Sequence, residues 1–276
     1  MKKFAFILLL AILSAQVFAQ SGASVFVSAR GNDINDGLSE STPFKSLDLA
    51  VVTAILTGVN KITVIGTLTI ENGRQDDIAV FRLVGLSNSN SELLITGIPN
   101  ASASDRAVLT GRGSGKATVF VIQNNIRFEH IEITGGEGEL PAGIVVNNSR
   151  VVLGQGVLVR NNQNAGVFVP KGTCIIDGGE VCENMFGIAV LDILIMQSGY
   201  IRNNGPFNGA GVGVRNGGQF TMTGGTITGN RAASYGGGVA VQSGGRFDQT
   251  GGTISGNTAP QSPNVYRQSG SLGSNL

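Results

Sequence analysis

The feature of this chain that most limits its fold is a sequence repeat near the C-terminal end. Residues 216–230, NGGQFTMTGGTITGN, return as SGGRFDQTGGTISGN at 243–257. Equivalent positions, such as Phe220 and Phe247, are 27 residues apart. A fixed period of this size is typical of stacked units that bury their apolar faces only against neighbouring units. The repeat therefore predicts a solenoid, although it says little about function.

The same pattern continues upstream with less regular spacing. In five successive units a glycine comes two residues before an aliphatic residue, and an asparagine comes three residues after it. The aliphatic residues are Leu158, Val181, Ile201, Ile227 and Ile254. The asparagines are Asn161, Asn184, Asn204, Asn230 and Asn257. We expect the aliphatic column to face the interior and the asparagines, in a left-handed bend, to stack at a corner.

Two further runs of alternating apolar residues accompany each unit. Alternation with period two predicts strands, and punctuation by Gly and Asn predicts tight turns between them. Three short strands per coil, with successive asparagines 20 to 27 residues apart, describe a parallel β-helix. We therefore predict an all-β fold, a single parallel β-helix of roughly nine coils over residues 59–268.

Composition narrows the function classes. Glycine accounts for 42 of 276 residues, which is about twice its usual share. Charged residues make up 13 %, about half the usual proportion. Because the formal net charge is only +1, electrostatics gives no reason to expect a nucleic-acid partner or an anionic membrane.

The first 19 residues have the pattern of a secretory signal peptide. Lys2 and Lys3 precede the apolar run 4–13, and Val17-Phe18-Ala19 is a small-residue cleavage site. We expect cleavage after Ala19, export, and no membrane insertion afterwards, because no later apolar run is long enough to span a bilayer. The predicted location is the cell surface, the periplasm or the medium.

Residues 20–58 predict a strand followed by a capping helix. Thr42 is the expected helix cap, Pro43 the first helical residue and Gly58 the stop signal. The expected buried face of the helix holds Leu47, Ala50, Val51, Ala54 and Ile55. Such a helix would cover the open apolar end of the first coil.

Two shorter segments leave less clear expectations. Asp33 and Asp36 lie in a Gly/Asn/Asp turn, which we read as a plain turn, with a calcium loop as the alternative. Residues 269–276 are rich in Ser and Gly, and we expect a flexible tail there.

Two resemblances concern parts of the chain. The segment VFVSARGNDINDGLSESTPFKSLDLAV, from Val25, resembles the N-terminal part of secreted bacterial β-helix proteins of the pectate-lyase-like superfamily. The repeats GGTITGN and GGTISGN in 210–257 are similar to those of polymorphic outer-membrane proteins of chlamydiae and related spirochaete proteins. The first resemblance implies a right-handed β-helix, and the second implies an adhesive role at the surface. Those surface proteins end in a membrane β-barrel, whereas only 19 residues follow Asn257 here.

A candidate site with both charge signs follows from the register. Residues beside the inward Val181 and Ile201 point outward, and neighbouring charged residues lie near them. The candidate binding residues are Arg160, Asp177, Glu180, Tyr200 and Arg202. Solvated cross-strand pairs are the simpler interpretation of this cluster. A lyase or hydrolase would use Asp177, Glu180, Glu183 and Arg202, and Ca²⁺ would be a cofactor only for the lyase.

The remaining chemistry-bearing residues predict no site. His130 is the single histidine, and we expect it near a strand corner at the surface. Cys174 shares the inward column of Phe220, whereas Cys182 falls among outward residues, so we expect no disulfide between them. The outward residues Thr226, Thr228, Thr253 and Ser255 would suit an ice-binding array, but two coils are few for that purpose.

These observations favour an exported, non-catalytic β-helix scaffold that binds a polysaccharide or another cell-surface ligand without a cofactor. The alternative is a carbohydrate-active enzyme with a groove near residues 177–202. The sequence leaves the ligand, the oligomeric state and the means of surface retention open.

Overall fold

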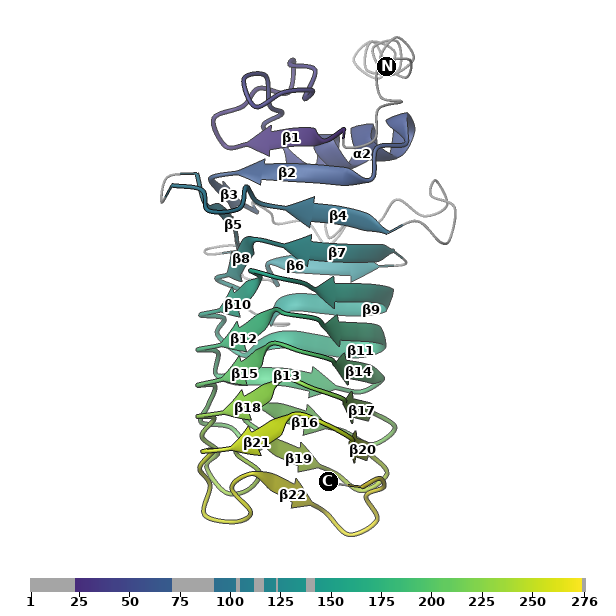
Figure 1. Ribbon diagram of the computed structural model, residues 1–276, viewed down its shortest axis with the longest axis vertical. Coiled ribbons are helices and arrows are strands. Elements are labelled where there is room, and N and C mark those ends of the chain that lie inside the picture. The colour runs from purple at the N-terminus through teal and green to yellow at the C-terminus, as the bar shows by residue number, and fades with distance from the viewer. Residues whose placement is uncertain are drawn as a thin grey trace.

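The computed structural model describes residues 23–70, 92–102, 105–111, 117–122, 124–137 and 142–274. It is a right-handed parallel β-solenoid whose short strands stack in coils along one axis (Figure 1). The predicted all-β class and parallel β-helix are therefore confirmed. The expected signal segment and a strand expected at 81–85 lie outside the described residues.

From β6 onward each coil contributes to three faces, which we call faces 1, 2 and 3 in chain order. Face 1 holds β6 (Val119–Ile122), the first parts of β9 (Ala142–Leu153) and β11 (Ala165–Ile176), β13 (Phe186–Val190), β16 (Val212–Val214), β19 (Val239–Val241) and β22 (Val265–Arg267). Face 2 holds β1 (Val25–Ser28), β2 (Lys61–Ile65), β4 (Leu93–Thr96), β7 (Asn125–Glu129), the second parts of β9 and β11, β14 (Ile193–Met196), β17 (Gln219–Met222) and β20 (Arg246–Gln249).

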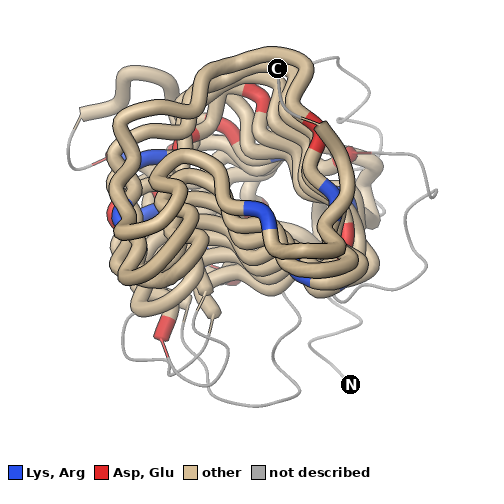
Figure 2. The backbone as a smooth tube through the Cα atoms, turned by 90° about the horizontal axis from the view of Figure 1, so that it is seen from below, with Lys and Arg blue, Asp and Glu red and all other residues tan. Residues whose placement is uncertain are grey.

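Face 3 is a sheet of eight strands, one from each successive coil. Its members are β3 (Thr67–Thr69), β5 (Ala107–Thr110), β8 (Ile131–Thr134), β10 (Leu158–Arg160), β12 (Glu180–Cys182), β15 (Tyr200–Arg202), β18 (Thr226–Thr228) and β21 (Thr253–Ser255). Its strand pairs are all parallel. Seen along the axis, the coils superimpose on one another (Figure 2).

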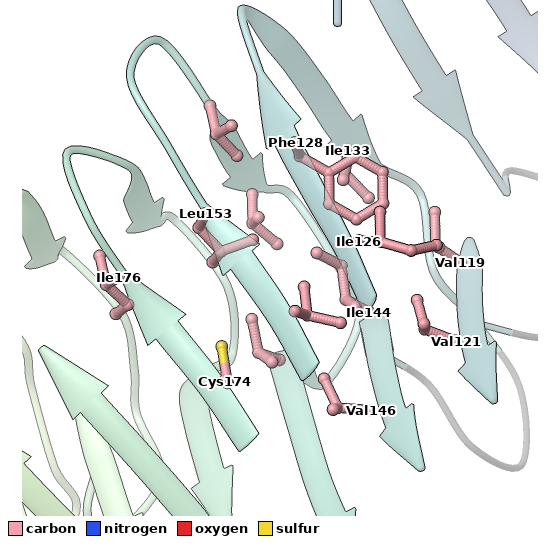
Figure 3. Packing of buried hydrophobic residues seen from close by; sticks show 14 of the residues in the cluster. Val119, Val121, Ile126, Phe128, Ile133, Ile144, Val146, Leu153, Cys174 and Ile176 are labelled. Atoms are coloured by element: carbon pink, nitrogen blue, oxygen red, sulfur yellow. The ribbon is translucent and has the colours of Figure 1, made fainter. Parts of the chain in front are cut away.

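The interior is a continuous apolar core that runs the length of the solenoid. Alternate residues of every face point into it, so stacked columns such as Cys174, Leu194, Phe220 and Phe247 are fully buried. Figure 3 shows side chains from facing strands meeting in this space. Phe220 and Phe247 stack with ring centroids 4.8 Å apart. Each buried aliphatic side chain stabilises the fold by about 1.5–3 kcal/mol.

The inward column of face 3 differs from the prediction in one coil. Val159, not Leu158, pairs with Val181 and is fully buried. Gly156 therefore lies three residues before the inward aliphatic, because the turn after β9 is one residue longer than in later coils. The other predicted members Val181, Ile201 and Ile227 are fully buried, and Ile254 packs against the core.

The asparagine column stands at the corner between faces 3 and 1. Its members are Asn162, Asn184, Asn204, Asn230 and Asn257, so Asn161 was the wrong choice in the first coil, by the same one-residue shift. Each Nδ2 donates to Oδ1 of the next asparagine over 2.9–3.1 Å. A second bond runs from Nδ2 to a backbone carbonyl at the corner. The left-handed bend is one residue earlier than predicted, for example at Asn203 with a φ of 55°.

Helix α2 (Leu47–Thr57) covers the N-terminal end of the core through Leu47, Ala50, Val51 and Ala54. Gly58 ends it in a left-handed conformation, as predicted. The predicted start was wrong, because Thr42 and Pro43 precede Phe44, whose backbone bonds to β1. Instead, Oδ1 of Asp33 accepts hydrogen bonds from the Lys45 and Ser46 backbone, both at 2.8 Å. No helix among the described residues is long and apolar enough to cross a membrane.

The last coil is closed in part by its own tail. The backbone of Leu272 pairs with β20 and accepts a hydrogen bond from Phe247 at 3.1 Å. The guanidinium of Arg267 lies over the Phe247 ring, 5.4 Å from its centroid. Part of the segment expected to be a flexible tail therefore contacts the final coil.

Candidate functional site

The outer surface of face 1 is unusually apolar for the outside of a solenoid. One outward column contains Phe120, Val145, Phe168, Ala189, Gly213, Ala240 and Tyr266. Several of its members pack with Ala142, Ala165 and Phe186 into a second hydrophobic cluster, separate from the core. Contiguous apolar surface outside the core is a common sign of a binding surface.

A cavity of about 450 Å³ lies over this surface. Its floor comes from β9, β11 and β13, and its far side from the loop after β15 and the loop after β18. The lining residues are Ala142, Asn164, Ala165, Phe168, Phe186, Ala189, Phe207, Asn208, Arg215 and Tyr235. We call this cavity the face 1 groove.

The loops that wall the groove exist because the later coils are longer. Successive ladder asparagines are 22 and 20 residues apart in the early coils but 26 and 27 apart in the later ones. Residues 203–211 and 229–238, which connect face 3 to face 1, contain Phe207 and Tyr235. The extra residues that make the repeat spacing irregular thus form the wall of the groove.

Three aromatic rings define the shape of the groove. Phe186 packs across Gly213, where a Cβ atom would lie 2.6 Å from its ring. Phe207 leaves 47 % of its surface exposed, which is high for so apolar a side chain. Tyr235 packs against Tyr266, with ring centroids 4.3 Å apart and ring planes tilted by 31°.

Planar polar groups lie among these rings. Asn164, Asn208 and Arg215 line the groove, and none of its lining residues in the described part of the chain is acidic. Arg215 is exposed, and no ion pair links it to a carboxylate of the described residues. Amide and guanidinium groups can donate several hydrogen bonds to hydroxyl or carboxylate oxygens. The groove therefore combines aromatic surface with available donors.

The predicted charged residues lie mainly on face 3, where they pair with one another. Arg160 donates to both carboxylate oxygens of Glu132 at 3.0 Å, and its Nη1 lies 3.8 Å from Glu183. These bonds to Glu132 are the main cause that raises the pKa of Arg160. Arg202 pairs with Glu180 in the next coil at 2.5 Å. The pairs follow cross-strand neighbours along a flat sheet, as in ordinary solvated decoration.

Two other predicted residues are not part of these pairs. Asp177 lies at the corner toward face 2, where its Oδ2 accepts from Arg127 at 3.1 Å and Ser198 bonds to its other oxygen at 3.4 Å. Tyr200 stands between Glu180 and Thr226 in register and is 50 % exposed. The structure thus brings Glu180 and Arg202 together, but directs Asp177 to another face.

The cysteines are free and occupy the register positions that the sequence predicted. Cys174 is inside face 2, and Cys182 is on the outward register of face 3, paired with Arg160 and Arg202. Cys182 is nevertheless only 2 % exposed, because neighbouring side chains cover it. Burial is the largest cause that raises its pKa to about 12, followed by a hydrogen bond with Glu180.

Other candidates offer little beyond structure. His130 lies between β7 and β8 with a φ of 48°, at the predicted strand corner. Asp36 accepts bonds from Leu38 and Thr42. Within the described parts of the chain, no three His, Cys, Asp or Glu side chains gather to form a metal site.

Sequence reasoning missed the face 1 groove, although part of its signal was present. Phe168 lies between the inward Val167 and Val169, so its outward position could be inferred from alternation. Phe207 and Tyr235 lie in loops, where alternation gives no direction. The placement of those two rings becomes clear only from the coil geometry.

Comparisons with protein-family models, with curated proteins and with solved structures find no match to this chain.

Proposed function

We propose that this protein is an exported, non-catalytic β-solenoid that binds a glycan in the face 1 groove and acts as an adhesive or glycan-binding scaffold. The observation that supports this best is the meeting in one cavity of aromatic rings, amides and an arginine that forms no ion pair with any described carboxylate. The site differs from the one that the sequence suggested near residues 177–202, but the class of function is the same.

A sugar ring matches the chemistry of this groove. Its C–H face packs on aromatic rings, and its hydroxyl groups exchange hydrogen bonds with planar amide and guanidinium groups. The volume of about 450 Å³ is within the usual range of roughly 300–1,000 Å³ for ligand sites. Phe186 and Phe207 would supply the apolar contacts, while Asn208 and Arg215 would fix the orientation of the ring.

The cellular setting of the proposal comes from the sequence. The signal pattern at residues 1–19 supports export to the periplasm, the surface or the medium. The resemblance of 25–51 to pectate-lyase-like proteins, and of 210–257 to polymorphic outer-membrane proteins, supports a polysaccharide or a host surface as the partner. Neither a cofactor nor a nucleic acid is part of this proposal.

A binding experiment with two matched aromatic variants tests the proposal. The mature protein would be applied to an array of neutral and acidic polysaccharides, and Kd would be measured for each hit. Phe207→Ala should weaken binding about tenfold or more, equivalent to about 1.4 kcal/mol. Tyr200→Ala is the control, because this ring is similarly exposed but lies on face 3. Equal effects of both variants, or no binding by the wild type, would contradict the proposal.

The alternative function is a polysaccharide lyase or glycoside hydrolase that uses Asp177, Glu180, Glu183 and Arg202. The observation that favours this alternative is the ion pair between Glu180 and Arg202. Acidic polysaccharides incubated with the protein and Ca²⁺ would then release unsaturated products, followed by their absorbance. Turnover that Glu180→Ala abolishes would favour the enzyme over the scaffold, whereas binding without turnover would favour the scaffold.

A further inference from the structure

Two cavities lie next to each other on face 1 and share three lining residues. The groove of about 450 Å³ ends on its C-terminal side at Tyr235. Beyond it lies a small cavity of about 20 Å³ that reaches Tyr266, Gln242 and Gln268. Asn208, Arg215 and Tyr235 line both. The Tyr235 ring therefore belongs to a wall that separates the groove from the outer surface of the last coils.

The position of Tyr235 is fixed from both neighbouring coils. On one side, Oδ1 of Asn208 accepts hydrogen bonds from the backbone N–H groups of Ser234, at 2.8 Å, and Tyr235, at 3.2 Å. On the other side, the backbone of Gln261 bridges Tyr235 and bonds to Ser234 at 2.9 Å. The ring itself packs against Tyr266. A wall held this way costs little to order when a ligand binds.

We propose that Tyr235 is the specificity-determining residue that ends the groove, so that the groove binds the terminal units of a glycan and not an internal stretch. This inference rests on the proposed glycan-binding function. A chain passing from β13 toward β22 would have to occupy the space that the Tyr235 ring fills. Gln242 and Gln268 offer amide groups beyond the wall, but a ligand in the groove does not reach them while the wall is closed.

Affinity as a function of chain length tests this inference. The probes are oligosaccharides of two to eight units prepared from cellulose, chitin and polygalacturonate, titrated by calorimetry. In the wild type, affinity should stop rising after the first few units. In Tyr235→Ala the two cavities should join, so affinity should continue to rise to the longest probes and exceed that of the wild type there by about fivefold or more.

A second pair of variants, at Asn208, shows whether the effect of Tyr235→Ala could come from disorder of the whole loop. Asn208→Ala should release the wall, raise amide hydrogen exchange at Ser234 and Tyr235, and give a length dependence close to that of Tyr235→Ala. Asn208→Asp keeps the accepting oxygen, so amide hydrogen exchange at Ser234 and Tyr235 should stay at the wild-type rate, and affinity should still stop rising after the first few units even if the loss of the amide weakens binding overall. Affinity that rises to eight units equally in the wild type and in Tyr235→Ala would overturn this inference alone. If neither the wild type nor any variant binds any probe, this inference is overturned, and these oligosaccharides are also excluded as ligands of the groove.

Discussion

Faces 1 and 3 belong to the same coils but present opposite kinds of outer surface. On face 3 the outward charges neutralise one another across coils, as Arg160 does with Glu132 and Arg202 with Glu180. On face 1 the outward column is apolar, and Arg215 lines a groove in which no described lining residue is acidic. Where surface polar groups already pair with one another, a ligand gains little binding free energy by contacting them. Where rings and hydrogen-bond donors have no such pairing, a ligand gains more.

The difference also shows what a longer coil contributes. The chain turns from face 3 to face 1 in only a few residues after β10 and after β12, at 161–164 and 183–185. In the later coils the extra residues lie in the connections 203–211 and 229–238, which project beside face 1. The core of the solenoid is therefore nearly constant along the axis, while the site depends on where the insertions fall.

The largest expected effect is on the corner that joins the two faces. Asn204 is 1 % exposed, donates to the carbonyls of Val181 and Arg202 and to Asn230, and accepts from Asn184. Asn204→Ala leaves several buried groups without partners, so the free energy of unfolding should fall by about 3–5 kcal/mol.

Urea denaturation at an unchanged m-value would measure that loss. The control is Asn216→Ala, an exposed asparagine in the turn after β16, which should cost less than about 0.5 kcal/mol. Comparable losses in the two variants would mean that the ladder contributes no more than surface asparagines do.

A smaller effect is expected on face 1 alone, at Gly213. A Cβ atom there would lie 2.6 Å from the Phe186 ring, and Gly213 has no positive φ that would strain an alanine. Gly213→Ala should therefore displace the ring, lower the free energy of unfolding by about 1–3 kcal/mol and weaken ligand binding in the groove.

A double-mutant cycle with Phe186→Leu sharpens this prediction. If the clash is the cause, Gly213→Ala should cost much less stability in the Phe186→Leu background than in the wild type. Strictly additive losses would show that Gly213 acts through something other than Phe186.

These two regions also show how far the sequence could lead. Period and alternation predicted the fold class, the inward columns and the asparagine stack, because a buried column must repeat in every coil. They were wrong by one residue at Leu158 and Asn161, since a single inserted residue in a turn shifts both positions without changing the composition. The predicted helix start was wrong because the backbone of Phe44 pairs with β1. This pairing is more favourable than a helix that is capped by Thr42 and begins at Pro43.

The candidate site was harder to predict for a different reason. Charged residues such as Glu180 and Arg202 attract attention in a sequence, but only the register between coils shows that they pair with one another. Phe207 and Tyr235 have no periodic signal, and their meeting with Phe186 depends on loop paths. The candidate site therefore lies where the chain departs from the repeat, and those segments have the least sequence pattern.

A further contrast concerns Cys182, an outer residue of face 3 that behaves like an interior one. Burial raises the pKa of its thiol from 9.0 to about 12. The folded state therefore holds the proton more tightly than the unfolded state, and stability should fall as pH rises from about 9 toward 12. The Tm of the wild type should fall between pH 8 and pH 10. In Cys182→Ala this fall in Tm should be about 2 °C smaller.

Alkylation offers an independent measure of the same burial. Iodoacetamide at pH 8.5 should leave Cys182 unmodified in the native protein and modify it in urea. Rapid native labelling at this position would mean that the face 3 side chains do not cover the thiol.

The smallest expected effect belongs to the ion pair between Arg202 and Glu180. Arg202 is about one-third exposed, so Coulomb attraction is partly screened and the pair contributes little. Arg202→Met should lower the free energy of unfolding by about 0.5 kcal/mol and leave glycan affinity unchanged, because the residue is on the face opposite in character to the groove. The matched variant is Arg215→Met on face 1, which has no described ion pair to lose and should weaken binding while leaving stability almost unchanged. If Arg202→Met instead loses binding and Arg215→Met keeps it, the site lies on face 3 and the charged cluster is the functional surface. The two variants are matched because the two arginines lie in adjacent segments of the same coil and differ mainly in the outer surface to which they belong.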